Sequence, residues 1–276
     1  MTRVLVMGAS GRLGAYMRQF WPGMAIDPVW QYRADAPADA LLWHPLRAPV
    51  PDCGPVETVL CLSGVTQGAA LDRNADLALA ALKAARALGA GRVLLASSSA
   101  VYGADPGPHA ENGPCRPVND YGHAKLAMEQ AAFRQADGVN LCCLRIGNIA
   151  GADALLGGLR PDVRPMLHRF KDGRAPRRAY IGPKTLSDVL AQLASRADVL
   201  PPVLNIAQPG LVGMDALLRA AGRDWDWTDA PATALPELRL ALDRLQGLCP
   251  FPAATAEALV AEWRLTWAAA TPTDRA

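Results

Sequence analysis

The chain has 276 residues, of which 51% are hydrophobic and 20% charged, so it can fill one large α/β domain or two small ones, and long disordered stretches are not expected. Its 28 basic and 26 acidic side chains give a formal net charge of +2, which provides no field suited to nucleic acid or to an anionic membrane. No apolar stretch reaches membrane-spanning length, and the six cysteines lack zinc-ligand spacing.

The chain begins directly in a strand-like run, without a charged-then-apolar leader. We therefore expect a cytoplasmic protein whose thiols are reduced. The four histidines are scattered along the chain, and no metal site is predicted.

Apolar runs of strand length alternate with helical patterns along most of the chain. One helix is predicted directly after the first strand, a second one ends at about residue 88, and a third covers 119–136. Strands are predicted at 3–7, 28–33, 40–43, 58–64, 92–99, 140–148 and 202–208. The strands are continuous runs of Val, Leu, Ile and Cys, which is typical of parallel strands buried on both faces. The pattern predicts an α/β fold with a Rossmann-type doubly wound parallel sheet.

The C-terminal quarter has a different pattern, with helices predicted near 214–221, 236–246 and 254–268. The Trp-rich stretch 223–229 either shapes a pocket or covers the core, and we favour the core. The expected organisation is a cofactor-binding core over 1–150, completed by about 179–209. A small, mostly helical substrate lobe is expected over 151–178 and 210–276.

The stretch "MGASGRLG" places three glycines at G-x-x-G-x-x-G spacing between the first strand and the first helix. Glycines there permit a tight turn and let backbone N–H groups approach a pyrophosphate, which then faces the N-terminus of the helix. We expect this loop to bind a dinucleotide through Gly8, Ser10, Gly11, Arg12, Leu13 and Gly14.

The end of the following strand, "QYRAD", bears on the choice of cofactor. An acidic residue there binds the ribose 2′-hydroxyl of NAD, whereas a basic one favours the 2′-phosphate of NADP. Arg33, with Arg12 in the glycine loop, favours NADP(H) over NAD(H). In the alternative, Arg33 is solvated and Asp35 bonds the ribose.

Two polar features follow in the chain. The stretch "LLASSSAVYG" places three hydroxyls at the C-terminal end of a predicted strand, where ligands bind in doubly wound folds, although serines there also cap or turn chains. Tyr121 and Lys125, in "YGHAK", share one helix face. Such a pair alone is more typical of a solvated face. Next to a cofactor, the ammonium and a cationic nicotinamide would lower the pKa of the tyrosine from about 10.

Together these motifs resemble the short-chain dehydrogenase/reductase superfamily, and within it the extended branch, the NAD(P)-dependent epimerase/dehydratase family. The resemblance covers nearly the whole chain. Ser98 matches the catalytic Ser/Thr of the family, and "YGHAK" matches its Tyr and Lys, so the implied catalytic residues are Ser98, Tyr121 and Lys125. The tyrosine and the lysine would also contact the cofactor. "LCLSGVT" is similar to the strand whose end touches the cofactor, which implies Leu62, Ser63 and Gly64.

Further segments extend the resemblance. Asn74, Glu111 and Glu129 fall at familiar positions, and "LRIGNIAG" is similar to the strand end whose Asn, here Asn148, faces substrate. "YIGPKTLSDVL" is similar to a short strand and an Asp, here Asp188, that precede a late helix. One departure is that His44 stands where an adenine-binding Asp is usual.

The resemblance implies an NAD(P)-dependent enzyme that transfers a hydride to or from a carbinol or keto carbon of a sugar nucleotide or a related polar carbonyl compound. Epimerase and keto-reductase both remain open, with a slight preference for the reductase. Ser99 and Ala100 occupy the positions where 4,6-dehydratases of the family carry an acidic pair, so a 4,6-dehydratase is not expected. Ser99 is placed among the substrate-binding residues.

Seven basic residues against two acidic ones stand between residues 160 and 178. Arginine suits phosphate, so this stretch, with Arg177, either binds the diphosphate of the substrate or is a solvated loop. The family resemblance also implies a homodimer formed through the helices near 74–88 and 119–136, with small residues at Ala75, Ala78, Ala124 and Ala131. A different class of function, a non-catalytic NADP(H)-sensing or assembly protein on the same fold, would not need the Ser, Tyr and Lys set.

Overall fold

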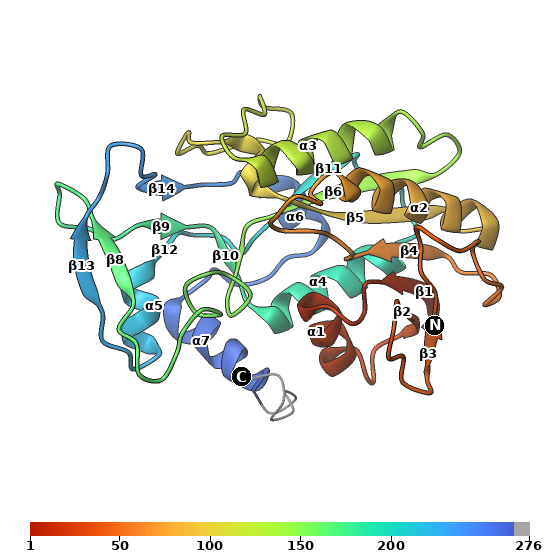
Figure 1. Ribbon diagram of the computed structural model, residues 1–276, viewed down its shortest axis with the longest axis horizontal. Helices are drawn as coiled ribbons and strands as arrows, with labels where there is room; N and C mark the ends of the chain where they lie inside the picture. The colour runs from red at the N-terminus through yellow and green to blue at the C-terminus, as the bar shows by residue number, and fades with distance from the viewer. Residues whose placement is uncertain (268–276) are drawn as a thin grey trace. The chain divides into compact units, whose positions relative to one another are not determined.

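A computed structural model describes residues 1–267 of the chain (Figure 1). Its central feature is a seven-stranded sheet in the order β11-β6-β5-β4-β1-β2-β3. The pairs β1–β2, β1–β4, β2–β3 and β4–β5 are parallel. The strands are β1 Thr2–Met7, β2 Ile26–Tyr32, β3 Ala40–Leu42, β4 Thr58–Cys61, β5 Arg92–Ser98, β6 Asn140–Ile146 and β11 Val203–Ile206.

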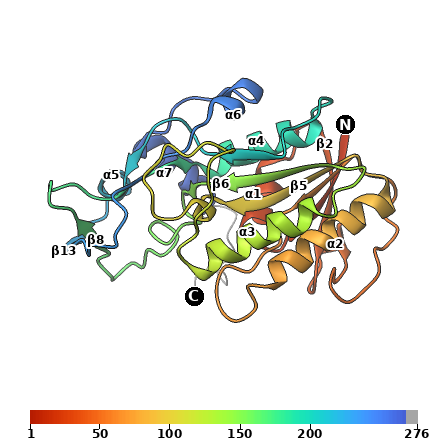
Figure 2. The same cartoon turned by 90° about the horizontal axis from the view of Figure 1, so that it is seen from above.

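Helices cover both faces of this sheet, as the predicted doubly wound fold requires. The pair α2 and α3 lies side by side on one face, and α1 and α4 lie on the other (Figures 1 and 2). Their bounds are α1 Arg12–Phe20, α2 Arg73–Leu88, α3 Asp120–Phe133 and α4 Pro183–Ser195. Because both faces are covered, β4 is buried throughout, and so is β1 from Val4 to Met7. The Rossmann-type prediction is confirmed.

The strand order reverses between β1 and β4, where the chain turns to build the other half of the sheet. Met7 at the end of β1 pairs with Cys61 at the end of β4. In open α/β sheets, ligands bind outside the carboxyl ends of the strands at this switch point. The fold therefore directs attention to the loops that follow β1 and β4.

The chain divides into two compact units. The first comprises Met1–Gly103, Pro114–Arg145 and Ser187–Leu204, and the second comprises Ala104–Gly113, Ile146–Leu186 and Asn205–Ala276. The boundaries expected from sequence, with a core to residue 150 and a lobe over 151–178 and 210–276, stay a prediction.

The second unit contains the helices α5 Met214–Ala220, α6 Asp243–Leu248 and α7 Ala256–Leu265. They accompany three small sheets, β10-β7, β12-β9-β14 and β13-β8. The strands are β7 Asn148–Ile149, β8 Met166–Arg169, β9 Arg177–Arg178, β10 Tyr180–Ile181, β12 Val212–Gly213, β13 Asp226–Asp229 and β14 Glu237–Leu238. The core of this unit joins Leu156 and Tyr180 to Leu259 and Trp263 of α7.

Three sequence predictions differ from the structure. The helix expected over 236–246 is instead the strand β14, a bridge between His109 and Leu240, and the short α6. Residues 223–229 cover the core only in part: the half-buried Trp225 packs against the cluster of Leu167, Ala175 and Leu218, whereas β13 is exposed along its length and Trp227 is 37% exposed. Asp188 lies within α4 rather than before it.

Candidate active site

The glycine loop leaves β1 in a conformation that suits glycine. Gly8 has φ +82°, and a Cβ at this position would lie 2.7 Å from the backbone nitrogen of Ser63. A Cβ on Gly14 would lie 2.4 Å from the Cα of Ala9, so α1 packs directly on the loop. The structure therefore brings the loops after β1 and β4 together and packs α1 closely against the glycine loop.

The first turn of α1 is open toward this loop. Its N-cap, Gly11, carries no side chain that could cap the helix, and α1 starts at Arg12. The positive end of the helix dipole is thus left for an anion. Ser10 and Arg12 are exposed, and Leu13 is half-buried. Their predicted role in binding a dinucleotide phosphate stays a prediction.

Gln31, near the end of β2, was not foreseen as part of the cofactor edge. Its side chain is fully buried, accepts a hydrogen bond of 2.8 Å from the Gly8 N–H, and donates one of 2.5 Å to the Trp43 carbonyl. Its amide joins the glycine loop to the segment that follows β3. Arg33, two residues on, is exposed, and Asp35 adopts a positive φ of 46°.

The loop after β4 contains the predicted cofactor residues Leu62, Ser63 and Gly64. The side chain of Asn74, on α2, clamps this loop by accepting from the Val65 N–H at 3.1 Å and donating to the Val65 carbonyl at 2.9 Å. A Cβ on Gly64 would lie 3.0 Å from Asn74 Oδ1 and 3.1 Å from Lys125 Nζ. The predicted cofactor loop and the predicted catalytic lysine are therefore in close proximity.

Ser98 ends β5 and caps the short 3-10 helix η1, Ser99–Tyr102, by accepting a hydrogen bond of 3.2 Å from the Ala100 N–H. Its hydroxyl is also hydrogen-bonded to the Tyr121 side chain. Tyr121 stands in the first turn of α3, which Asn119 caps by accepting from the Gly122 N–H at 2.8 Å. The strand end and the helix start thus bring the two predicted catalytic hydroxyls together.

Burial raises the pKa of Tyr121 above its ordinary value, and the hydrogen bond with Ser98 opposes that rise. The chain by itself therefore keeps the phenol protonated at neutral pH. The lowering expected from a nearby cation is not produced by Lys125 alone, although its nitrogen lies 5.8 Å from the centre of the Tyr121 ring.

Lys125 is almost fully buried, with 4% of its surface exposed, and its Nζ donates a hydrogen bond of 2.8 Å to the Ala96 carbonyl. Burial lowers its pKa, and Cys61, Cys143 and Glu129 act to raise it. Tyr121 and Lys125 share one face of α3, as the spacing predicts, and Lys125 points to the sheet.

The predicted substrate residues lie in both units. Ser99 is buried in η1 of the first unit. Asn148 and Arg177 belong to the second unit, in β7 and β9. The partners of Asn148 could not be inferred from the sequence. It pairs in register with Tyr180 of β10 and is hydrogen-bonded to the Tyr180 side chain, which in turn donates to Asp153 Oδ2 at 2.8 Å.

Several arginines of the basic stretch 160–178 form ion pairs with acidic side chains or donate hydrogen bonds to backbone carbonyls. Arg177 forms an ion pair of 3.0 Å with Glu237, and Arg164 pairs with Asp224 at 3.1 Å. Arg178 donates to the Arg177, Pro236 and Leu235 carbonyls. Arg177 and Arg178 thus join β9 to β14 and the residues before it, and the role of the stretch in binding phosphate stays a prediction.

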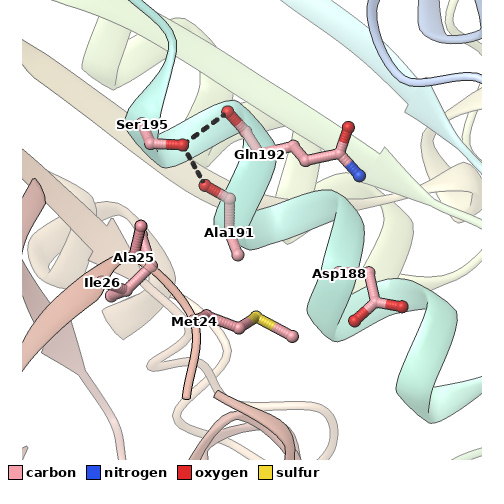
Figure 3. A pocket seen from close by; sticks show the side chains of 7 residues that line it. All are labelled: Met24, Ala25, Ile26, Asp188, Ala191, Gln192 and Ser195. Carbon is pink, nitrogen blue, oxygen red and sulfur yellow. Dashed lines mark hydrogen bonds between the residues drawn. The ribbon is translucent and has the colours of Figure 1, made fainter. Parts of the chain in front are cut away.

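The cavity in Figure 3, of about 370 Å³, lies elsewhere. Met24, Ala25 and Ile26 line it at the start of β2, and Asp188, Ala191, Gln192 and Ser195 line it from α4. The start of β2 is the edge of the sheet opposite to the glycine loop. This cavity is therefore separate from the candidate active site.

Within residues 1–267, no helix is both long and apolar enough to cross a membrane. Over the same residues, no cluster of three or more His, Cys, Asp or Glu side chains is arranged to hold a metal ion.

Comparisons with known proteins agree with this fold. The "NAD dependent epimerase/dehydratase family" matches residues 62–186. A UDP-glucose 4-epimerase of Corynebacterium glutamicum is 37% identical over 87 residues, which are 30% of this chain and 26% of that protein. The chain thus spans about a quarter of the length of this curated relative.

Two solved structures share the fold over nearly the whole chain. One is "MoeE5 in complex with UDP-glucuronic acid and NAD", with a TM-score of 0.77, 22% identity, and coverage of 97% of this chain and 100% of that one. The other is an NAD-dependent NDP-hexosamine 5,6-dehydratase, TunA, with a TM-score of 0.78, 17% identity, and coverage of 99% and 100%.

The sheet order, with the glycine loop at its switch point, defines a Rossmann-type fold, and this fold is shared with MoeE5. The family match over residues 62–186 contains all three predicted catalytic residues, so over that stretch the chain is similar to the NAD-dependent epimerase/dehydratase family.

Proposed function

We propose that the chain is an NAD(P)-dependent oxidoreductase that transfers a hydride to or from a carbinol or keto carbon. The observation that carries the proposal is the contact between two hydroxyls, Ser98 and Tyr121, with the buried Lys125 one helical turn further on. This arrangement supplies a hydroxyl donor, an acid and a fixed cation at the switch point of the sheet.

The residues take distinct roles in this proposal. The Ser98 hydroxyl holds the substrate oxygen, and the Tyr121 phenol gives or takes the proton of that oxygen. Because burial raises the pKa of Tyr121, the phenol is ready to donate at neutral pH, which suits the reduction of a carbonyl. A nicotinamide, when bound, supplies the hydride. Lys125 stays in place through its bond to the Ala96 carbonyl.

The proposed cofactor is NADP(H). Support for a pyrophosphate comes from the close packing at Gly8 and Gly14 and from the start of α1 at Arg12, whose N-cap Gly11 has no capping side chain. The exposed Arg33 directly after β2 supports a 2′-phosphate, and so does Arg12. The neighbour MoeE5 was solved with NAD, so the choice between the two cofactors needs a direct test.

The proposed substrate class is a sugar nucleotide. Support comes from the local similarity to a UDP-glucose 4-epimerase and from the fold shared with MoeE5, which was solved with UDP-glucuronic acid. Asn148, Arg177 and Ser99 are the proposed substrate contacts. We favour keto-reductase or epimerase over 4,6-dehydratase, because Ser99 and Ala100, the first residues of η1, cannot act as an acidic pair.

We also propose a homodimer formed through α2 and α3. Ala75, Ala124 and Ala131 are half-buried within one chain and so leave small surfaces for close packing, whereas Ala78 is already buried. Light scattering that finds only monomer at micromolar concentration would remove this proposal.

The function is tested with Tyr121→Phe and the control His123→Ala, an exposed position on the same helix. Turnover is measured by NADPH oxidation with UDP-4-keto sugars and by interconversion of UDP-glucose and UDP-galactose. Tyr121→Phe should lower kcat by about 10²- to 10⁴-fold and keep the thermal shift caused by NADPH, because the loss is of proton transfer alone. His123→Ala should stay within about twofold of the native chain.

Full turnover by Tyr121→Phe would refute the catalytic proposal. A native chain that binds NADPH and yet turns over no member of the panel would favour the non-catalytic sensor.

A further inference from the structure

A buried ion pair lies directly behind the candidate active site. Arg145 of β6 meets Glu129 of α3 with two parallel contacts, Nε to Oε1 at 3.1 Å and Nη2 to Oε2 at 2.8 Å. The side chains are 6% and 2% exposed. Burial alone would lower the pKa of Arg145, but its bonds to Glu129 and the charge of Glu129 raise it, so the guanidinium stays charged.

Two further side chains join this pair and connect it to the residues around Ser98. The Ser97 hydroxyl donates to Glu129 Oε1 at 2.5 Å, and Arg145 Nη1 donates to the Tyr102 hydroxyl at 3.1 Å. Ser97 directly precedes Ser98 on β5, and Tyr102 ends the η1 helix that Ser98 caps. The network therefore holds the chain on both sides of Ser98.

The same network reaches the lysine. Glu129 stands four residues after Lys125 on α3, and its charge acts on the ammonium. Lys125 also faces the Tyr121 ring, the Met128 sulfur at 3.9 Å, and the thiols of Cys61 and Cys143. Burial raises the pKa of Cys61 to about 11 and that of Cys143 well above its ordinary value, so both thiols are neutral. Among the described groups acting on Lys125, Glu129 is thus the one negative charge.

Stability alone gives a weak reason for such an arrangement. Removing two charges from water costs as much as their attraction returns, and a well-packed apolar pair of the same volume is often equally stable. The ion pair also constrains orientation, because a bidentate contact between a carboxylate and a guanidinium fixes the angle between the two elements that carry them. Here those elements are α3, with Tyr121 and Lys125, and β6, with bonds that extend to β5 and η1.

We propose that Glu129 is a positioning residue of the active site: together with Arg145 it fixes α3 against β5 and η1, and it balances the buried charge of Lys125. The inference rests on the proposed function, since Lys125 has a chemical task only there. Its test is independent of turnover and of any bound molecule, so its failure is distinguishable from failure of the proposed function.

The test follows the titration of Lys125 itself. The chain has four lysines, Lys83, Lys125, Lys171 and Lys184, so ¹³C-lysine labelling gives few NMR signals, and the one lost in Lys125→Met belongs to Lys125. In Glu129→Gln, the titration midpoint of Lys125 should move to lower pH, because the negative charge is gone and Arg145 is left unpaired. Glu129→Asp, which keeps the charge, should restore the native midpoint at least in part.

A matched control separates this effect from simple loosening of the fold. Ser97→Ala removes one hydrogen bond of Glu129 and keeps both charges of the ion pair. It should therefore leave the Lys125 midpoint unchanged. If Glu129→Gln does not fold, the double variant Glu129→Gln/Arg145→Met removes both charges and should still lower the midpoint. A native midpoint in a folded variant without the carboxylate would overturn the proposal.

Discussion

The Nζ of Lys125 donates a hydrogen bond of 2.8 Å to the carbonyl oxygen of Ala96, two residues before Ser98 on β5. The bond joins the helix that carries Tyr121 to the strand that ends at Ser98. It also holds an ammonium group in a place where only 4% of the side chain is exposed, and burial lowers its pKa accordingly. The ammonium group of Lys125 thus lies in an environment that favours its neutral form.

This burial predicts a specific dependence of stability on pH. Between the lowered pKa in the folded chain and the ordinary value of about 10.4 in the unfolded chain, the unfolded state binds more protons at Lys125. The contribution of Lys125 to the free energy of unfolding therefore rises with pH in that window and is constant below it. Relative to Lys125→Met, the native chain should gain stability as the pH approaches 10.4.

Urea unfolding of both proteins across this pH range measures the gap between them. The control is Lys83→Met, at an exposed position of α2 that stays in water in both states, for which a constant gap is expected. A gap that does not change for Lys125→Met would contradict the prediction.

The glycine loop gives a second prediction, from a pair of glycines with similar backbone angles. Gly8 has φ +82° with Ser63 against it, and Gly23 has φ +86° with nothing within 4 Å of a Cβ. Alanine at either position should cost about 1–2 kcal/mol for the left-handed backbone. Gly8→Ala should cost about 1–3 kcal/mol more, because Ser63 backbone atoms must move.

Thermal or urea unfolding measures both costs, and isothermal titration with NADPH measures binding. Gly23→Ala should bind the cofactor as the native chain does, whereas Gly8→Ala should bind it at least about tenfold more weakly. Equal stability losses in the two variants would refute the close approach at Ser63.

The third prediction concerns Tyr180, which links Asn148 to Asp153 within the second unit. Tyr180→Phe leaves a buried carboxylate with only backbone partners, such as the Leu156 N–H at 3.1 Å, so the free energy of unfolding should fall by about 1–3 kcal/mol. Burial already raises the pKa of Asp153, and the Tyr180 hydroxyl opposes that rise. The loss should therefore be largest at neutral pH and shrink as Asp153 becomes protonated in acid.

Chemical unfolding at neutral and acidic pH tests this dependence. Adding Asp153→Asn to the Tyr180→Phe chain removes the charge that has lost its partner, so it should cost less there than in the native chain. The same cost in both backgrounds would show that the two side chains do not act together.

The central sheet was predictable because most of its strands contain a continuous apolar run, such as Val4–Met7 in β1 and Leu141–Leu144 in β6. Tyr121, Lys125 and Ser98 were also identifiable, since a pair at spacing four shares a helix face and serines at a strand end reach the ligand edge. Gln31 could not be found in this way, because a buried glutamine has no periodic signal and its partners, the Gly8 N–H and the Trp43 carbonyl, are distant in sequence.

The secondary structure of the second unit was harder to predict from the sequence, for a physical reason. Its two-residue strands carry too few residues to show a period. The predicted helix at 236–246 was wrong because its leucines follow a period of two: Leu238 and Leu240 are buried, and Arg239 between them is exposed. That alternation marks an extended chain, and the backbone of residues 239–241 bonds to Pro106 and His109.

The last prediction addresses the cofactor. Arg33 is exposed directly after β2, whereas Asp35 is the acidic residue that would serve NAD instead. If Arg33 bonds a 2′-phosphate, Arg33→Ala loses a charge-assisted hydrogen bond of about 1.5–3 kcal/mol, which corresponds to roughly a 10- to 100-fold weaker affinity for NADPH. Affinity for NADH should change by less than about twofold, because NADH lacks that phosphate.

Calorimetric titration of both cofactors measures this difference, with Arg134→Ala as the control at an exposed arginine next to the end of α3. The contrary result is equally informative. If Arg33→Ala leaves both affinities unchanged and Asp35→Ala selectively weakens NADH, the acidic residue recognises the ribose. The NADP(H) preference would then be withdrawn. The proposed roles of Ser98, Tyr121 and Lys125 would stand, since none of them depends on the group at the 2′ position of the cofactor ribose.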